Sequence, residues 1–360
     1  MNPLSRNIVD EITRGLEPTS EPWRQRARQH LDTLTKPLGS LGRLEDLTAQ
    51  IVSIRQENFA EEIGKGAYIF ASDHGVAAEG VSAYPREVTY QMVLNYLSHG
   101  AAINVLARLH HVDLHVIDVG VDADFQGIPG MLHRKVARGT YNMVHQAAMT
   151  DDFLAQALSV GAEAAVSAVA AGHTMIAIGE MGIGNTTSAS AITCALTGAT
   201  ALEATGRGTG IHPEAHRRKI DVVQTAVDKH FGSSGANASP LEILRCVGGL
   251  EIAAMTGMML AAATHRRVIV VDGIICTAAA AIAVAIAPAV RDYLVAGHQS
   301  EEPGHKLLLA YLNLTPVLAF NMRLGEATGA VLAMPILESA MALYNQMATF
   351  ASAGVNEAVR

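Results

Sequence analysis

Four short apolar segments, each ending beside aspartate, glutamate or glycine, constrain this fold more than any other feature of the sequence. They are rich in the β-branched residues typical of buried strands, and helix-forming segments separate them. The four segments are 68–71, 114–120, 175–178 and 268–271. Strands that alternate with helices predict an α/β fold with a mostly parallel sheet and helices on both faces.

Helices are expected between the strands and at both ends of the chain. The segments expected between and after the strands are 87–109, 151–171, 187–204, 214–230, 240–263 and 277–296. Residues 1 to about 60 have an amphipathic helical pattern that is interrupted at 34–43, and a long apolar helix is expected over about 330–350. We expect these terminal helices to pack together as a small second lobe.

Polar or glycine-rich residues stand at the ends of all four expected strands. In a parallel sheet, ligands bind beyond the carboxyl ends of the strands. The residues found there are Asp73-His74-Gly75, Asp118-Val119-Gly120, Gly179-Glu180 and Asp272-Gly273. The sequence therefore predicts a ligand site at this edge of the sheet.

The charge balance argues against two classes of partner. With 26 basic and 34 acidic residues among 360, the chain has a formal charge of −8 and no basic stripe. We therefore expect neither a nucleic acid nor a membrane as partner. The apolar segment 268–287 is about as long as a membrane span. Asp272-Gly273 divides it, however, into a strand and a helix.

Cysteine usage predicts a cytoplasmic protein. Cys194, Cys246 and Cys276 are scattered in apolar surroundings without CxxC spacing. This pattern argues against a disulfide framework or a zinc site, and it favours small buried side chains in a reducing compartment. The N-terminal region carries Asp10 and Glu11 and has no long apolar core, so we expect no signal peptide.

A glycine-rich turn, Gly179–Thr187, follows the third expected strand and precedes an expected helix. Glycines let a backbone approach a ligand closely, and the free N–H groups of a first helical turn favour a phosphate. The turn has neither the Gly-Lys-Ser/Thr of a Walker loop nor the spacing of a dinucleotide-binding motif. Because the Glu180 carboxylate stands at the mouth of this turn, we expect chemistry on a phosphorylated small molecule.

A second glycine cluster, at 206–210, has two interpretations that its spacing does not separate. One is a second anion-binding loop with Arg207 or Lys219 as the countercharge. The other is an ordinary glycine-rich connection between helices.

His74 also has two interpretations, a metal ligand or a strand-end residue satisfied by hydrogen bonds, and the second is favoured. No HExxH motif of a zinc-binding helix occurs in the sequence, and no cysteine accompanies the histidines. We therefore expect no metal.

Glu326 is a candidate general base. It lies among small residues, with Leu324 before it and an apolar helix after it. Apolar surroundings raise the pKa of a carboxyl group toward neutrality, where a general base is efficient. The alternative, which the sequence pattern alone favours, is a glutamate at a helix N-terminus that interacts with the helix dipole.

Several long motifs occur together and in order along the chain. They are Thr35-Lys36-Pro37-Leu38-Gly39-Ser40-Leu41-Gly42, Asp73-His74-Gly75-Val76, His115-Val116-Ile117-Asp118-Val119-Gly120, Gly179–Thr187 and Arg323-Leu324-Gly325-Glu326. Val247-Gly248-Gly249, 255–260, Asp272-Gly273 and Ala333-Met334-Pro335-Ile336 extend the match. With these motifs, nearly the whole chain closely resembles the nicotinate-nucleotide–dimethylbenzimidazole phosphoribosyltransferase family.

The resemblance implies an enzyme of cobalamin lower-ligand assembly. Such an enzyme transfers the 5-phosphoribosyl group of nicotinate mononucleotide to 5,6-dimethylbenzimidazole, without a cofactor. The products are α-ribazole 5′-phosphate and nicotinate, with inversion from the β to the α anomer. The resemblance also implies a homodimer with a Rossmann-like large catalytic domain, here 63–334. A small helical domain is implied from both termini, here 1–62 and about 335–360.

The resemblance further implies roles for individual residues. Glu326 matches the general base, and Glu180 matches a carboxylate that orients the ribose and stabilises positive charge at C1′. The residues expected to bind phosphate and nucleotide are Gly182, Gly184, Asn185, Thr186, Gly208, Lys219, Asp272 and Ser300. The residues expected around the acceptor base are Tyr84, Gln91, Met92, Met181 and Leu324.

Three base-pocket positions depart from the best-known family pattern, and they leave the acceptor open. Tyr84 stands where a serine can occur, Met92 rather than Gln91 where a glutamine can occur, and Met181 where a leucine can occur. Adenine, another benzimidazole or a phenol are therefore alternative acceptors. A hydrolase and a non-catalytic nucleotide-binding protein are further alternatives, and the presence of both glutamates argues against the second.

Overall fold

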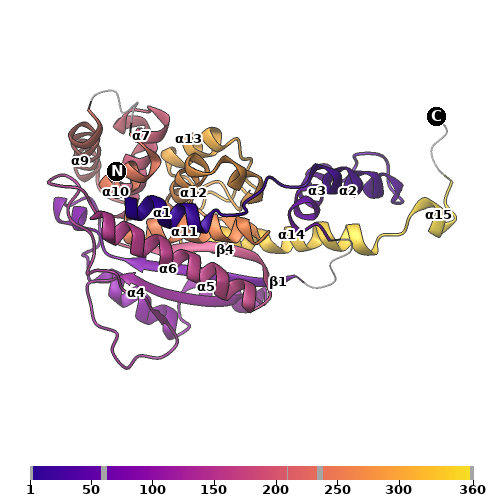
Figure 1. Cartoon of the computed structure of the whole chain (residues 1–360), viewed down its shortest axis with the longest axis horizontal. Coiled ribbons are helices and arrows are strands. Elements are labelled where there is room, and N and C mark those ends of the chain that lie inside the picture. Colours follow the sequence, from indigo (N-terminus) through magenta and orange to yellow (C-terminus); the bar gives the residue numbers. More distant parts are fainter. Residues whose placement is uncertain (1–2, 58–62, 209, 233–237, 357–360) are drawn as a thin grey trace.

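The computed structural model describes residues 3–57, 63–208, 210–232 and 238–356, and its central element is a six-stranded sheet. All neighbouring strands pair in parallel, in the order β3-β2-β1-β4-β5-β6. The strands are β1 (Gly64–Ser72), β2 (Asp113–Gly120), β3 (Leu132–His133), β4 (His173–Met181), β5 (Val268–Val271) and β6 (Leu294–Ala296). The expected α/β fold is therefore confirmed (Figure 1).

The four expected strands are present, and two short edge strands, β3 and β6, add to them. β6 lies within 277–296, for which the expectation of a single helix was wrong. The chain leaves the helix at Ile286, makes a 3-10 turn over Pro288–Tyr293 and then pairs with β5. A three-residue strand is too short to give a sequence pattern of its own.

β4 extends further than the sequence pattern indicates. The expected strand ends at Ile178, but pairing with β1 continues to Met181. The glycine turn therefore begins at Gly182, and Glu180 belongs to the strand rather than to a loop. A carboxylate on a paired strand is held more rigidly than one on a loop.

The helices cover the sheet and continue beyond it (Figure 1). In chain order they are α1 (Pro3–Ile12), α2 (Glu21–Thr33), α3 (Arg43–Arg55), η1 (Gly75–Glu79), α4 (Val88–Leu97), α5 (Ala102–Leu109), α6 (Asp151–Ala170), α7 (Asn185–Thr197), α8 (Ala201–Ala204), α9 (Pro213–Phe231), α10 (Pro240–Val247), α11 (Leu250–Thr264), α12 (Ile274–Ile286), η2 (Pro288–Tyr293), α13 (Pro303–Leu312), α14 (Thr328–Gln346) and α15 (Phe350–Ala353).

Three of the expected helices are each broken in two. The breaks fall at His99 in 87–109, at Gly198 in 187–204 and at Gly248-Gly249 in 240–263. His99 and Gly198 have left-handed backbone, and Gly248 and Gly249 are extended, so none of these residues continues a helix.

Helices α2, α3 and α15 and the end of α14 lie beyond the sheet as an arm, drawn from both ends of the chain (Figure 1). Helix α1 packs instead on α6 and α11 over the sheet. Helix α14 passes through position 335, where Pro335 lies inside it. The domain boundaries at 62 and about 335 stay a prediction.

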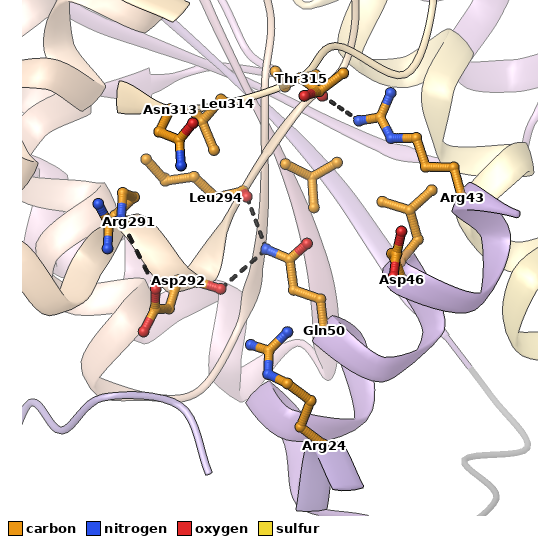
Figure 2. Close-up of a pocket in the computed structure, with 13 residues that line it drawn as sticks. Arg24, Arg43, Asp46, Gln50, Arg291, Asp292, Leu294, Asn313, Leu314 and Thr315 are labelled. Carbon is orange, nitrogen blue, oxygen red and sulfur yellow. Dashed lines mark hydrogen bonds and ion pairs between the residues drawn. The ribbon is translucent and has the colours of Figure 1, made fainter. Parts of the chain in front are cut away.

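A pocket of about 450 Å³ lies where α3 meets the sheet (Figure 2). Arg43 of α3 donates hydrogen bonds to the backbone carbonyls of 315–316. Gln50, also on α3, donates to the carbonyls of Asp292 and Leu294 at 3.0 and 2.9 Å. These bonds fasten the arm to the sheet, so we assign this pocket a structural role.

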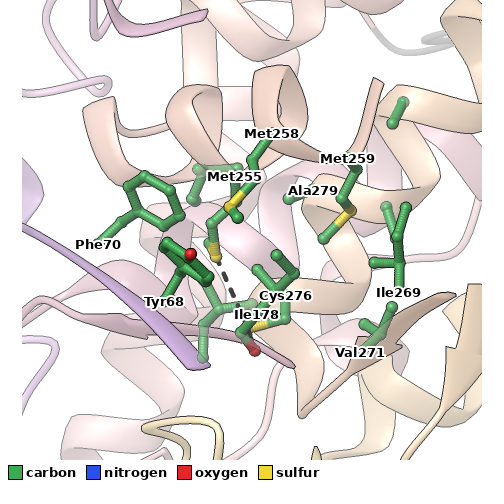
Figure 3. Close-up of a cluster of buried hydrophobic side chains, with 14 of the residues drawn as sticks. Tyr68, Phe70, Ile178, Met255, Met258, Met259, Ile269, Val271, Cys276 and Ala279 are labelled. Atoms are coloured by element: carbon green, nitrogen blue, oxygen red, sulfur yellow. Dashed lines mark hydrogen bonds between the residues drawn. The ribbon is translucent and has the colours of Figure 1, made fainter. Parts of the chain in front are cut away.

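Sulfur-containing side chains fill the space between α11 and the sheet (Figure 3). Met255 and Met258 of α11 lie over Tyr68 and Phe70 of β1, and Cys276 of α12 lies 3.7 Å from the Met255 sulfur. Methionine fills irregular gaps of this kind because its side chain is flexible and polarizable. All three cysteines are free and buried, as expected.

Alternation along β1 places α14 on the opposite face of the sheet from α11. Tyr68 and Phe70 point toward α11, so Ile69 between them points the other way. There it flanks Gly179 together with Ala327, which precedes α14. Helices therefore cover both faces, and Ala327 can approach β4 closely because Gly179 has no side chain.

Helices α6 and α11 cross with their backbones in direct contact. A Cβ atom at Gly161 would collide with the carbonyl of Ala254, and one at Gly257 would collide with the carbonyl of Leu158. Overpacking a core in this way destabilises a protein by about 1–3 kcal/mol, and more where backbone must move. We expect Gly161→Ala to lower the free energy of unfolding by about 2 kcal/mol or more, measured by chemical denaturation.

The control for that substitution is Val166→Ala, at a half-exposed position on the same helix. Because little apolar surface is buried there, we expect the control to change the free energy of unfolding by about 0.5 kcal/mol or less. A Gly161→Ala protein as stable as this control would contradict the close crossing of the two helices.

Within the part of the chain that the structure describes, one helix, α6, is long and apolar enough, by length and composition, to cross a membrane. It packs on α11 and α1 over the sheet, and its exposed positions include Asp152 and Glu163. A core helix of a globular protein passes the same test of length and composition. The packing of α6 identifies it as such a core helix.

Candidate active site

A cavity of about 390 Å³ lies beyond the carboxyl ends of β4, β5 and β6, at the edge where the sequence predicts a ligand site. Small-molecule sites have volumes of roughly 300–1,000 Å³. The polar lining residues are Glu180, Asn185, Thr186, His298, Ser300, Glu302, Arg323 and Glu326. The remaining lining residues are Tyr84, Val88, Met92, Met181, Gly182, Ile183, Gly208, Gly273, Ile274, Ile275, Leu324 and Gly325.

The glycine turn connects β4 to α7 and lines the cavity. A Cβ atom at Gly182 would collide with the carbonyl of Ser72, and Gly184 has a φ of 100° as the residue that caps α7. Both positions therefore require glycine. Asn185 and Thr186 are the first two residues of α7, so the N-terminus of this helix adjoins the cavity, as in sites that bind phosphate.

Glu180 enters the cavity from β4 and is only 5% exposed. The side-chain amide of Asn185 donates a hydrogen bond to its carboxylate. Burial raises the pKa of Glu180 to about 8, and the charges of Asp272, Glu251 and Glu326 add to the rise. In the absence of a bound cation, this surplus of negative charge favours protonated Glu180 at neutral pH.

Glu326 stands in a strained loop at the start of α14. Residues 325–327 have φ values of 87°, 62° and 62°, and left-handed backbone is unfavourable for the two that are not glycine. The Asp272 carboxylate accepts hydrogen bonds from the N–H groups of Gly329 and Ala330, at 2.8 and 3.0 Å. Asp272 therefore anchors the helix that follows the loop and helps to fix the position of Glu326.

The environment of Glu326 suits a general base. Burial raises its pKa to about 7, while the nearby hydroxyl of buried Tyr96 lowers it. Its Oε2 atom is buried without a hydrogen-bond partner in the described structure, and so is the Tyr96 hydroxyl. A Cβ atom at Gly325 would lie 2.5 Å from Oε1 of Glu180, so the two glutamates adjoin the same end of the cavity.

The second glycine cluster lies beside the first. Lys219 of α9 is completely buried and donates a hydrogen bond to Oγ1 of Thr186 at 2.7 Å. A Cβ atom at Gly208 would lie 3.0 Å from both of these groups. Burial lowers the pKa of Lys219 to about 8. Arg207 is exposed, so this arrangement favours an anion-binding loop with Lys219 as the countercharge.

The apolar side of the cavity contains four of the five expected base-pocket residues. Met92 and Met181 line it, and Tyr84 and Leu324, which are 54% and 55% exposed, lie at its mouth. Gln91 is exposed on α4 and does not line the cavity. On α4, the side chains of Val88 and Met92, one helical turn apart, face the same way.

Ser300 lines the cavity, whereas Asp272 lies behind its wall. Sequence reasoning did not single out His298, Glu302 or Tyr96. The first two flank Ser300 in a polar run before α13, which is the only sequence signal for them. The apolar lining residues also missed are Val88, Ile183, Ile274 and Ile275.

His74 is satisfied by hydrogen bonds, as expected. Its Nε2 lies 2.6 Å from Oε1 of Glu251 and its Nδ1 lies 3.1 Å from Oγ of Ser188. The pair is buried directly behind the glycine turn, where His74 flanks Gly184. Among the described residues, no group of three or more histidine, cysteine, aspartate and glutamate side chains is arranged to hold a metal ion.

The raised pKa of Glu326 makes stability depend on pH. The folded chain holds this proton more tightly than the unfolded chain, so stability is lost as pH rises from about 4.5 through about 7. A shift from 4.5 to about 7 corresponds to a penalty on the order of 3 kcal/mol at high pH. We expect Glu326→Gln to raise the melting temperature at pH 8.5 but not at pH 5, measured by calorimetry without ligands.

Glu214→Gln is the control, because Glu214 is exposed in the first turn of α9. We expect this control to shift the melting temperature equally at the two pH values. An equal shift for Glu326→Gln would mean that the Glu326 carboxyl is not perturbed in the folded chain.

Comparison with known proteins places this chain among phosphoribosyltransferases. Residues 16–355 match the family model described as "Phosphoribosyltransferase". The nicotinate-nucleotide–dimethylbenzimidazole phosphoribosyltransferase of Geobacter metallireducens is 44% identical over 350 residues, which cover 97% of this chain and 98% of that relative. The protein of the same name from Chloroflexus aurantiacus is 45% identical over 353 residues. These residues cover 98% of this chain and 100% of that relative.

A solved structure agrees with these sequence matches. The crystal structure of CobT from Thermus thermophilus superposes with a TM-score of 0.89 at 45% sequence identity. The match covers 94% of this chain and 100% of that one.

Proposed function

This chain belongs to the nicotinate-nucleotide–dimethylbenzimidazole phosphoribosyltransferase family, and we propose that it catalyses the reaction after which the family is named. It transfers the 5-phosphoribosyl group of nicotinate mononucleotide to 5,6-dimethylbenzimidazole. The products are α-ribazole 5′-phosphate and nicotinate, and the reaction serves the assembly of cobalamin. The observation that carries the proposal is a pair of buried glutamates between an anion-binding cluster and an apolar pocket.

The leaving group needs no acid. Nicotinate departs from a pyridinium cation, so the electrons of the broken C–N bond neutralise its ring nitrogen. The incoming benzimidazole attacks C1′ through one ring nitrogen and must lose the proton on the other. Glu326 accepts that proton, and its pKa of about 7 lets it do so near neutral pH.

Glu180 faces the other charged centre of the reaction. As nicotinate leaves, positive charge develops on C1′ and the ring oxygen of the ribose. A fixed carboxylate in a site without much water stabilises such charge strongly. The cationic donor also favours the ionised form of Glu180, whose pKa is about 8 in the empty site.

The two glycine clusters bind the phosphate of the donor. The backbone of Gly182 and Gly184 approaches the phosphate, and Asn185 and Thr186 supply the first turn of α7. Lys219 supplies the positive charge beside Thr186. Gly208 adjoins Lys219, and Ser300, which also lines the cavity, contributes to binding the nucleotide. Asp272 acts from behind the wall by anchoring α14.

The acceptor base occupies the apolar side of the cavity. Met92 and Met181 contact its ring, and Tyr84 and Leu324 cover it from the mouth. Both methionines are flexible, so this pocket tolerates changes in the shape of the acceptor. Dimethylbenzimidazole is the acceptor we propose, in agreement with the names of the relatives.

We also propose a homodimer in the cytoplasm. The family resemblance implies the dimer, and exposed apolar side chains at Leu38, Phe320 and Leu324 are available for an interface. Three free, buried cysteines agree with a reducing compartment. Sedimentation velocity of the purified chain tests the dimer directly.

The decisive experiment measures nicotinate release from nicotinate mononucleotide, with and without dimethylbenzimidazole, and identifies the nucleotide product by mass. Release that depends on the acceptor, with the mass of α-ribazole phosphate, supports both reaction and acceptor. Release without acceptor identifies a hydrolase instead. Release that requires adenine or a phenol overturns the choice of acceptor but not the reaction.

A further inference from the structure

A carboxylate already occupies the anion-binding cluster. Glu302 precedes α13 and is 6% exposed, and its Oε1 accepts a hydrogen bond from the backbone N–H of Gly208 at 2.8 Å. Its Oε2 is buried and has no hydrogen-bond partner in the described structure. An acidic side chain is thus buried in the cluster that we propose for the donor's phosphate.

The loop is shaped around this carboxylate. A Cβ atom at Gly206 would collide with Oε2 of Glu302, so only glycine leaves room for it there. Arg323 donates to the carbonyl of Gly208 at 3.1 Å and holds the same peptide segment from the other side. Several contacts of this loop therefore accommodate the hydrogen bond between Gly208 and Glu302.

Gly208 and Lys219 can interact with either of two anions, the Glu302 carboxylate or a phosphate. A phosphate beside Thr186 needs hydrogen-bond donors, and the backbone of Gly208 and the ammonium group of Lys219 both adjoin Thr186. Glu302 takes the first of these donors, and its negative charge acts on the second. A phosphate bound beside Gly208 and Lys219 and the Glu302 carboxylate are both negatively charged and repel each other, so they compete for the cluster.

We propose that Glu302 is an internal competitor that the donor's phosphate displaces from Gly208, so that Glu302 sets the affinity of the site for phosphorylated ligands. This inference rests on the phosphate position in the proposed function. In the empty enzyme, the carboxylate satisfies Gly208 and balances the charge of Lys219. When the donor binds, the phosphate takes over both groups.

The consequence concerns turnover. Donor and product carry the same 5′-phosphate, so a competing carboxylate weakens the binding of both equally. Uniform weakening of this kind raises the KM without helping the chemical step. It also speeds release of the phosphorylated product, which limits the rate of many enzymes. Glu302 thereby keeps a buried, cationic cluster from retaining its product.

The pKa of Lys219 predicts how the effect of Glu302 on phosphate affinity depends on pH. The charge of Glu302 raises the pKa of Lys219, which burial lowers to about 8. Without Glu302 the lysine loses its proton at lower pH. The gain in phosphate affinity on removing Glu302 is therefore largest in mildly acidic solution and shrinks as pH rises through about 8.

The test is a calorimetric titration of the full-length protein with inorganic phosphate at pH 6.5. Hydrogen bonds to charged groups contribute about 1.5–3 kcal/mol and neutral ones about 0.5–1.5 kcal/mol, so glutamine competes less strongly for the Gly208 N–H and removes one negative charge. We expect Glu302→Gln to bind phosphate about fivefold more tightly than wild type or better. The matched control is Glu301→Gln, the exposed neighbour, for which we expect no change.

Three outcomes overturn the inference. Unchanged phosphate binding in Glu302→Gln means that the carboxylate does not compete. Weaker binding in both Glu302→Gln and Glu302→Ala means that Glu302 holds the loop in its binding conformation. If neither wild type nor variant binds phosphate, the cluster is not an anion site and the inference fails as well.

The transfer assay separates this inference from the proposed function. If wild type transfers phosphoribose, we expect the KM for nicotinate mononucleotide to fall in Glu302→Gln. If wild type shows no transfer, the proposed function fails, and the phosphate titration alone still decides the role of Glu302.

Discussion

Substitution of Glu326 by glutamine is expected to lower the turnover number for phosphoribosyl transfer by about 10² or more, the usual contribution of a general base. Glutamine keeps the size of the side chain but cannot accept the proton of the benzimidazole. Because the carboxylate acts only as the new C–N bond forms, we expect little change in affinity for nicotinate mononucleotide. The measurement is steady-state nicotinate release at saturating acceptor.

The pH dependence of the rate identifies the base. In wild type, kcat should rise with pH and level off above about 7, the pKa of Glu326, because the bound cationic donor keeps Glu180 ionised. In the glutamine variant this rise should disappear. Glu214→Gln, at an exposed position of α9, should behave as wild type does. Unchanged turnover in the Glu326 variant would remove it as the base.

Local sequence pattern was sufficient to predict the four main strands and the edge of the sheet at which the cavity lies. Each main strand is a short apolar run, and burial on both faces of a parallel sheet requires such runs. The residues after the strands, among them Gly182 and Gly273, line the cavity because the carboxyl ends of parallel strands share one edge. The glycine turn was also predictable, since free N–H groups at a helix start have a recognisable sequence context.

Contacts between distant segments were not predictable from pattern. Glu302 meets Gly208 across 94 positions of sequence, and Lys219 meets Thr186 across 33. Nothing in the local sequence of a lysine on a helix indicates that it is completely buried. The left-handed backbone of Glu326 was equally hidden, because it depends on the bonds from Gly329 and Ala330 to Asp272.

The structure also changes how the two glutamates are understood. In the sequence they are 146 positions apart, and Glu326 has a structural alternative as a glutamate at a helix N-terminus. In the fold, β4 holds Glu180 and a strained loop holds Glu326. Gly325, the residue before Glu326, contacts the Glu180 carboxylate, so the two glutamates are close neighbours. Such rigid placement of two acidic groups around one cavity is typical of sites where charge develops during reaction.

The second large effect is expected for Glu180→Gln. This variant keeps an oxygen that can accept the hydrogen bond from the Asn185 side chain, so the turn before α7 is retained. It removes the negative charge that faces C1′ as the nicotinate bond breaks. Loss of one such electrostatic group typically lowers kcat by about 10²–10³.

The Glu180 variant should differ from the Glu326 variant in two respects. We expect its KM for the cationic donor to rise, because the charge of Glu180 also acts on the pyridinium ring in the ground state. We expect its rate still to increase with pH, because Glu326 remains as the base. Single-turnover nicotinate release at several pH values measures both properties. A Glu180→Gln enzyme with wild-type kcat would exclude this carboxylate from stabilising the ribosyl cation and would leave Glu326 as the only acidic group in the reaction.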